Sequence, residues 1–278
     1  MAASGYIFDE QDMSDPLQLQ LLDPSPVDSP LQSPVLSPST VPRNHGQSHS
    51  SRGVVYYLTK TQRLSSYAFT GFLGIHFATT GILPLISLLE TAENSLILSR
   101  VLYQNRFLEP TLVVGSLGVH VLSGVALRII QRVRQYRRYD RIVWIKDLDL
   151  VHLTGYALIP TVMVHFGIVR GLPLVIDGGS EGIGISFIAH GFSVFRYISW
   201  TVYGSLATLG AYHAVQGLSR WWCLSKRWRR VTFGVIVGIA GTWLASVTRL
   251  SRIGRAVGHL GRHYDMLYST LLDSSGRI

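Results

Sequence analysis

The sequence predicts an all-α protein, a five-span transmembrane helical bundle with a disordered N-terminal arm. Charged side chains make up 15% of the 278 residues and hydrophobic side chains 47%, whereas a soluble domain carries about 25% charged residues. Mean hydropathy is +0.27 although the first fifty residues are polar. The apolar excess therefore lies in the remainder, where it falls into runs of about 20 residues that can cross a bilayer.

Residues 1–53 form a proline- and serine-rich arm that we expect to be disordered. Its prolines stand among serine, aspartate and glutamine, and such a composition buries too little apolar surface to offset the entropy of ordering. Four acidic residues crowd the extreme N-terminus, and no basic segment precedes an apolar run. This pattern argues against a secretory signal and against a matrix presequence.

Residues 54–248 are expected to form the five-helix transmembrane domain. A short amphipathic helix over 54–64 leads into it, and none of the five runs contains Asp, Glu or Lys. The predicted spans are Tyr67–Leu89, Thr111–Ile130, Val151–Val169, Tyr197–Leu218 and Val231–Val247.

Two further segments accompany the spans. Residues 183–195 are semi-apolar, and periodicity does not decide between a helical extension and an interfacial segment. Residues 249–278 form an amphipathic C-terminal tail, with four arginines against leucine, isoleucine and valine. An interfacial helix is the expected form of this tail.

The basic residues predict the orientation. Six lie between the second and third spans and five between the fourth and fifth, while the other two connections carry only four near their ends. With five spans, the two basic loops share a side with the N-terminus. The positive-inside rule then places the arm in the cytosol. The net charge of +9 fits anionic headgroups better than nucleic acid, because the basic residues flank apolar runs.

Four histidines, His76, His120, His165 and His213, lie inside predicted spans. Counted from the basic side at 1.5 Å per residue, His76 and His120 both fall about 14–15 Å deep. Two facing imidazoles can ligate a haem iron, so these two are candidate haem b ligands. The alternative is that each imidazole makes an interhelical hydrogen bond. A histidine four residues before a glycine in spans two and four, and a histidine with a proline in spans one and three, suggest a duplicated two-helix unit. Chance similarity between apolar helices is the alternative.

Hydroxyl groups follow the same helices, and they have two interpretations. They could line a polar groove for lipid headgroups, or each could bond back to its own helix. The set is Thr70, Thr79, Thr80, Ser116, Ser123, Thr154, Thr161, Ser205 and Thr208.

Motifs of soluble enzymes are absent from the sequence. It has no phosphate-binding glycine-rich loop, no HExxH and no Gly-x-Ser-x-Gly. The single cysteine, Cys223, excludes an intramolecular disulfide and a cysteine-only metal site. We therefore expect no enzyme and no metal site.

The arm carries one specific pattern. Leucines alternate with glutamines up to Leu21 and Leu22, and Pro24 and Pro26 form the chain's one Pro-x-Pro. An extended peptide of this kind can add to a sheet edge, and its stiff backbone lowers the ordering cost. A plain low-complexity arm is the alternative. A third interpretation is regulatory, because four serines precede prolines at four-residue spacing; they are Ser25, Ser29, Ser33 and Ser37.

Together, the arm and the spans resemble the fungal mitochondrial outer-membrane adaptor family named for complementing loss of the Mdm-ten protein. The matching residues are Pro24 and Pro26 in the arm, His76 in span one, and the His120/Gly124 stretch of span two. The membrane domain of that family is similar to the membrane anchors of succinate dehydrogenase and fumarate reductase.

The resemblance implies a function. In that family the Pro-x-Pro peptide recruits a VPS-thirteen class lipid-transfer protein to membrane contact sites, which supports lipid homeostasis, and the membrane domain is associated with lipid scrambling. Carried over, Pro24 and Pro26 are the docking prolines and Leu21 and Leu22 assist them. The expected location is the mitochondrial outer membrane. The alternative function is a b-type haem protein of electron transfer, with His76 and His120 as ligands.

Overall fold

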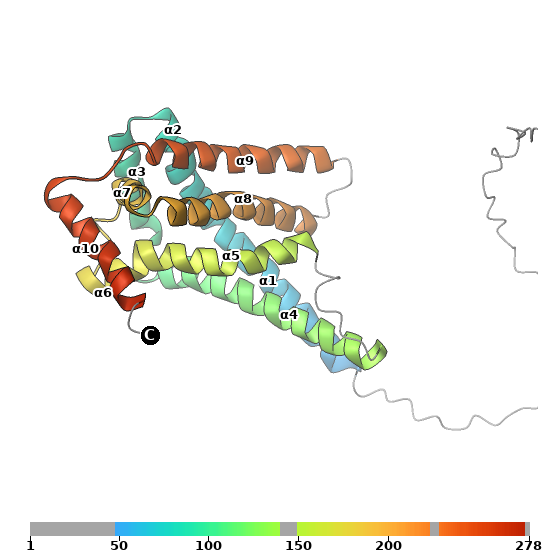
Figure 1. Cartoon of the computed structure of the whole chain (residues 1–278). Coiled ribbons are helices and arrows are strands. Elements are labelled where there is room, and N and C mark those ends of the chain that lie inside the picture. The colour runs from blue at the N-terminus through green and yellow to red at the C-terminus, as the bar shows by residue number, and fades with distance from the viewer. Residues whose placement is uncertain (1–47, 140–148, 223–227, 276–278) are drawn as a thin grey trace, which may run out of the picture. The chain divides into compact units, whose positions relative to one another are not determined.

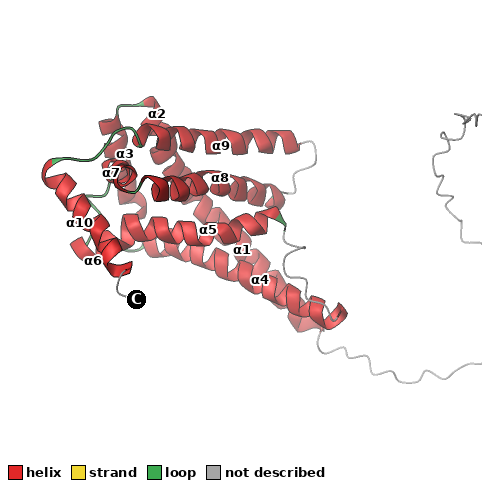
Figure 2. Cartoon of the chain, viewed as in Figure 1, coloured by secondary structure: helices red, strands yellow, loops and turns green. Residues whose placement is uncertain are grey.

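The computed structural model describes residues 48–139, 149–222 and 228–275. All regular elements in these ranges are helices, which confirms the predicted all-α class. Figures 1 and 2 show them as a bundle of long helices with shorter helices at one end. The docking residues expected in the arm, Leu21, Leu22, Pro24 and Pro26, lie outside the described residues.

Five long helices make the bundle. They are α1 (Ser48–Phe77), α4 (Ser116–Tyr139), α5 (Leu150–Phe166), α8 (Arg196–Trp221) and α9 (Arg229–Leu250). The largest contact surfaces join α1 to α4, α5 to α8, and α8 to α9. The expected amphipathic helix over 54–64 is not separate from the first span, because α1 runs through both without a break.

The predicted count of five spans is wrong by one. Four segments are long and apolar enough to cross a membrane: Gly53–Ile86, Glu109–Arg138, Leu150–Asp177 and Arg230–Leu250. The predicted fourth span forms α8, which is long enough but too polar. Its tyrosines, hydroxyl residues and His213 lower its hydropathy. Because α8 lies between α5 and α9 (Figure 1), neighbouring helices shelter much of this polar surface.

Three π-helical segments interrupt the long helices, each beside a proline. The segment η1 (Ala78–Ile82) precedes Pro84 in α2 (Leu83–Ile86), and η2 (Glu109–Gly115) contains Pro110. The third, η3 (Gly167–Gly171), precedes a proline in α6 (Leu172–Asp177). Proline has no N–H to donate to the preceding turn, so the ladder widens locally.

Helix α9 satisfies the backbone groups that the break after η1 sets free. The Ser246 hydroxyl, fully buried, donates to the Thr80 carbonyl at 2.6 Å. Arg249 donates to the carbonyls of Pro84 and Ser87. In a bilayer, side chains of neighbouring helices must take over such groups because no water is present to do so.

The spacing of histidine and proline reveals an internal duplication. His76 precedes Pro84 by eight residues and His165 precedes Pro173 by eight, and a π-helical segment lies between them in both cases. The unit α1–α4 corresponds in this way to α5–α8, and the helices within each unit pack on one another. The weak repeat in the sequence is therefore a repeat in the structure.

A cap of shorter helices covers one end of the bundle. It contains α3 (Leu89–Tyr103), α7 (Ile185–Val194) and α10 (Gly258–Ser275), and Phe187 of α7 packs against Tyr264, Leu267 and Tyr268 of α10. The semi-apolar stretch 183–195 is thus mostly α7. The C-terminal tail divides: its first arginine belongs to α9, a turn follows, and α10 buries three large side chains against α7.

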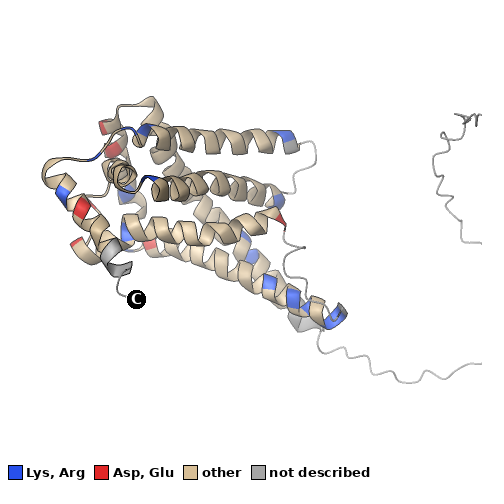
Figure 3. Cartoon of the chain, viewed as in Figure 1, with Lys and Arg blue, Asp and Glu red and all other residues tan. Residues whose placement is uncertain are grey.

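The two ends of the bundle differ in charge (Figure 3). Arginines gather where α4 and α8 end and α9 begins. Of the eight acidic residues in the described ranges, only Asp149 lies at that end; the others lie in α3, η2, α6, α10 and the loop after α6. One end is therefore strongly basic, and the other carries mixed charges.

Candidate functional site: paired histidines inside the bundle

The first histidine pair joins α1 to α5. The ring centroids of His76 and His165 lie 6.2 Å apart at 61°. Phe72 stacks on His76 at 5.5 Å, and Tyr203 of α8 meets His165 edge-on at 5.5 Å. The Nδ1 atoms of both imidazoles are buried and have no hydrogen-bond partner. Such groups are rare in folded proteins and often indicate a missing ligand or water.

The second pair joins α4 to α8. The ring centroids of His120 and His213 also lie 6.2 Å apart, at 85°. His120 Nδ1 donates to the Gln62 carbonyl at 3.3 Å, and His213 Nδ1 donates to the Val151 carbonyl at 2.9 Å. A Cβ added at Gly155 would lie 2.8 Å from Cε1 of His213, so only glycine leaves room for this ring.

The predicted pairing of His76 with His120 is wrong, because each of them lies beside another histidine. His120 lies beside Gln62 of α1, and Gln62 precedes His76 in that helix by fourteen residues. At 1.5 Å per residue, the levels of His120 and His76 are therefore about 21 Å apart. The predicted depths of His76 and His120 assume that Tyr67, where span one begins, lies level with Ile130, where span two ends. Gly124 in fact faces Gln62, so in this antiparallel pair Ile130 lies about 16 Å beyond Tyr67. One iron cannot bridge His76 and His120.

Most hydroxyls of the predicted polar groove bond to their own helices. Eight of the nine donate to a carbonyl three or four residues earlier, Ser205 being the exception. A groove of about 530 Å³ does run between α1, α8 and α9, but its lining is largely apolar; Leu73, Phe77, Val235 and Trp243 contribute to it. The hydroxyls therefore give no support to a polar headgroup path.

Polar contacts join η2 to η3 at the same end of the bundle as the cap. The guanidinium of Arg170 in η3 donates two hydrogen bonds of 2.5 Å to the carboxylate of Glu109 in η2, and a third of 2.9 Å to the Ser180 hydroxyl. These contacts join the far ends of α4 and α5. Each side chain of the Arg170–Glu109 pair is at least 83% covered, because their exposed fractions are 17% and 15%.

A second group of polar contacts anchors α10. The buried His190 accepts from the Ala256 N–H at Nδ1 and donates from Nε2 to Asp265 at 2.9 Å. A hydrogen bond from Arg255, with the one from His190, lowers the pKa of the Asp265 carboxyl. Tyr264 donates to the Gly182 carbonyl at 2.9 Å, and burial raises the pKa of its phenol.

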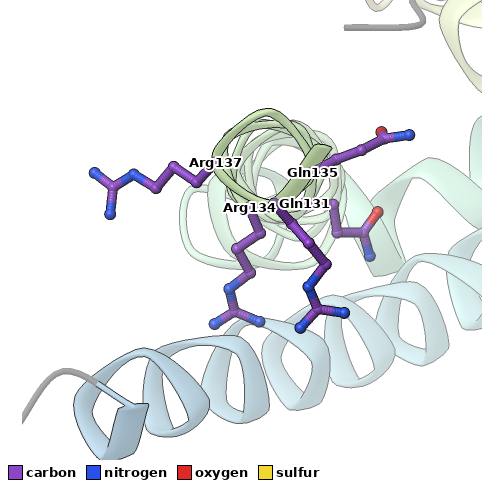
Figure 4. A pocket seen from close by; sticks show the side chains of 5 residues that line it. Gln131, Arg134, Gln135 and Arg137 are labelled. Carbon is purple, nitrogen blue, oxygen red and sulfur yellow. The ribbon is translucent and has the colours of Figure 1, made fainter. Parts of the chain in front are cut away.

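The basic end carries an open hollow of about 710 Å³ beside the last turns of α4. Figure 4 shows Arg134 directed toward α1 and Arg137 directed away from it. The hollow is lined by Gln131, Arg134, Gln135, Arg137 and Arg138. None of these lining residues is acidic. Such a surface attracts anionic headgroups within a Debye length. No group of three or more His, Cys, Asp or Glu in the described part of the chain could hold a metal ion.

Comparison with protein families identifies the chain. The family model described as MDM10-complementing protein 1, transmembrane domain, matches residues 71–156 and 160–261, which is more than half of the 278 residues. The chain belongs to this family. Membership in the MDM10-complementing protein 1 family agrees with the four apolar helices and supports a mitochondrial membrane protein. This family is not a known enzyme family. Comparisons with curated proteins and with solved structures gave no match.

The match contains all four paired histidines, and the sequence offered a signal for the pairing. His165 and His213 had appeared only as intramembrane histidines without partners. The equal spacing from His76 to Pro84 and from His165 to Pro173 relates His76 to His165. The shared histidine–glycine spacing relates His120 to His213. In the structure each histidine faces its equivalent in the other unit.

Proposed function

We propose that the protein is a mitochondrial outer-membrane adaptor that recruits a VPS-thirteen class lipid-transfer protein to membrane contact sites. The observation that carries this proposal is the family match over residues 71–156 and 160–261. The helical bundle is the anchor, and the arm that precedes α1 binds the partner. Recruitment of such a partner supports lipid homeostasis at the contact site.

The charge pattern supports an arm in the cytosol. Helix α1 begins at the bundle end where the arginines of α4, α8 and α9 gather. Residues on the cytosolic side of membrane proteins are enriched in lysine and arginine. An anionic cytosolic leaflet would attract this end further, by about 1 kcal/mol for each basic residue near the surface.

The docking peptide is proposed to centre on Pro24 and Pro26. Proline fixes its own φ angle, so a Pro-x-Pro segment is extended before it binds and loses less entropy on binding. Leu21 and Leu22 precede it directly. Their side chains would fill apolar pockets while the backbone adds to a sheet edge of the partner.

The test is recruitment by the full chain in cells. Pro24→Ala with Pro26→Ala should abolish recruitment of the lipid-transfer protein while the variant stays in its membrane. Pro30→Ala with Pro34→Ala is the matched control, because it removes two prolines of the same arm outside the motif. Unchanged recruitment by the first variant would refute the docking peptide. Equal loss with both variants would point to the arm's general stiffness instead.

Lipid scrambling, which the resemblance also implies, has no observation in its favour among the described residues. The hydroxyls of the expected polar path are used within their helices, and the groove between α1, α8 and α9 is largely apolar. Scrambling is measured separately, as loss of protected fluorescence in liposomes treated with dithionite.

A further inference from the structure

Two histidine pairs with nearly the same geometry lie across the interface between the repeated units. His76 and His165 occupy equivalent positions, as do His120 and His213, and both pairs have a centroid separation of 6.2 Å. In proteins built from internal repeats, ligand sites commonly lie where the repeats meet. Two equivalent pairs therefore indicate two equivalent sites, one above the other along the bundle.

The separation within each pair suits a metal ion held between two imidazoles. A metal–imidazole nitrogen bond is about 2 Å, and a five-membered ring with bonds of about 1.33 Å has a radius of about 1.1 Å. Two bonds and two radii in line sum to about 6 Å, which agrees with both pairs. The rings are too far apart to hydrogen-bond directly, and their separation equals the span that an ion between two facing ring nitrogens requires.

The hydrogen bonds of the second pair prepare it for ligation. A ligating histidine almost always donates its other ring N–H to a carbonyl or a carboxylate, which fixes the tautomer. His120 and His213 both donate from Nδ1 to backbone carbonyls, so both Nε2 lone pairs remain available. In the first pair, the buried Nδ1 atoms of His76 and His165 have no partner.

An arginine lies near each of the two levels, and the one near the second level is incompletely paired. Nη2 of Arg128, on α4 beyond His120, is buried and has no hydrogen-bond partner, and Arg128 interacts electrostatically with His152 at the start of α5. Arg100 interacts electrostatically with His76. Its Nη1 donates to the Ser180 carbonyl, and its guanidinium also interacts with Tyr103 and Glu93. A buried guanidinium normally pairs with a carboxylate, which a ligand carrying acid groups would supply to Arg128.

We propose that the bundle binds two haem b groups, one ligated by His76 and His165 and the other by His120 and His213. Haem supplies the four equatorial nitrogens that no third or fourth residue at these levels provides in the described chain. Its apolar body suits the interior of a helical bundle, and its propionates suit Arg100 at the first level and Arg128 at the second. Each haem would be held by one histidine from each repeated unit. When bound, haem supplies a one-electron redox centre.

The test is the haem content of purified full chain in detergent, after expression with haem supply or titration with haemin. Haem is counted by its pyridine haemochrome, and the folded state is checked by circular dichroism and gel filtration. The unmodified chain should hold two haems with a spectrum of iron bound by two nitrogens. His259→Ala is the matched control, because His259 is an exposed histidine of α10, and it should also hold two.

The variants distinguish the pairs. His76→Ala and His165→Ala should each halve the haem content, and combining them should cause no further loss. His120→Ala and His213→Ala should behave alike, whereas His76→Ala with His120→Ala should remove both haems. A variant that fails to fold is replaced by the glutamine substitution, which keeps a hydrogen-bond donor. No uptake by the folded unmodified chain, binding of a bare metal ion without haem, or any other pattern of loss overturns the assignment.

Discussion

Replacing Glu109 by glutamine removes the charge that faces Arg170 between η2 and η3. The carboxylate accepts two hydrogen bonds of 2.5 Å from that guanidinium. Breaking a fully buried pair from one side costs about 3–5 kcal/mol, because the remaining charge is buried alone, whereas an exposed pair contributes about 0–1 kcal/mol. With exposed fractions of only 17% and 15%, we expect a loss close to the buried limit, about 3 kcal/mol.

The assay is thermal unfolding of the purified full chain in detergent. A loss of about 3 kcal/mol corresponds to a midpoint lowered by about 6–12 °C in a chain of this size. Asp149→Asn is the matched control, because Asp149 pairs with Arg220 at the basic end and their exposed fractions are 48% and 44%. We expect that variant to lose less than about 1 kcal/mol.

A double-mutant cycle then isolates the pair. Arg170→Gln combined with Glu109→Gln should be less destabilised than the sum of the two single variants, since neither charge is left alone. If Glu109→Gln lowers the midpoint no more than Asp149→Asn does, the pair does not join the two halves of the bundle and the reasoning from burial is wrong.

Three further outcomes are expected. Ser246→Ala should lower stability by about 1–2 kcal/mol, because the Thr80 carbonyl loses its donor in an apolar setting. Ser269→Ala, which removes an exposed hydroxyl of α10, should change the unfolding midpoint far less. Gly155→Ala should displace the His213 ring, so the haem content should fall to one per chain. Gly234 has open space around it, so the haem content of the Gly234→Ala control should stay unchanged. The packing of α10 against the rest of the cap should weaken as pH falls below about 3.8, the ordinary pKa of aspartate. The pKa of Asp265 is lowered in the folded state. The ionised carboxylate therefore stabilises the folded state above that pH, and this stabilisation is lost when Asp265 is protonated. Hydrogen exchange of α10 amides between pH 3 and 6 measures this, and exchange that is independent of pH after correction for the intrinsic rate would contradict it.

The helical class and most of the spans follow from the sequence because they depend on local composition. Hydrocarbon has no hydrogen-bonding partners, so a run of about 20 apolar residues must be helical whatever surrounds it. The run at 197–218 shows the limit of this argument. Whether the tyrosines, hydroxyls and His213 of α8 face lipid or protein depends on α5 and α9, and no local count of hydropathy contains that information.

The sequence alone also marked the intramembrane histidines as the residues to examine, because ionisable groups are costly there. Tertiary structure decided which of them meet. The register of α1 against α4 is set by the contact of Gln62 with His120 and Gly124, and not by where the apolar run begins. That register separates His76 from His120 and brings each beside its equivalent in the other repeated unit. Depth along one helix can be counted from a sequence, but the level of one helix against another is fixed only by side-chain packing between them.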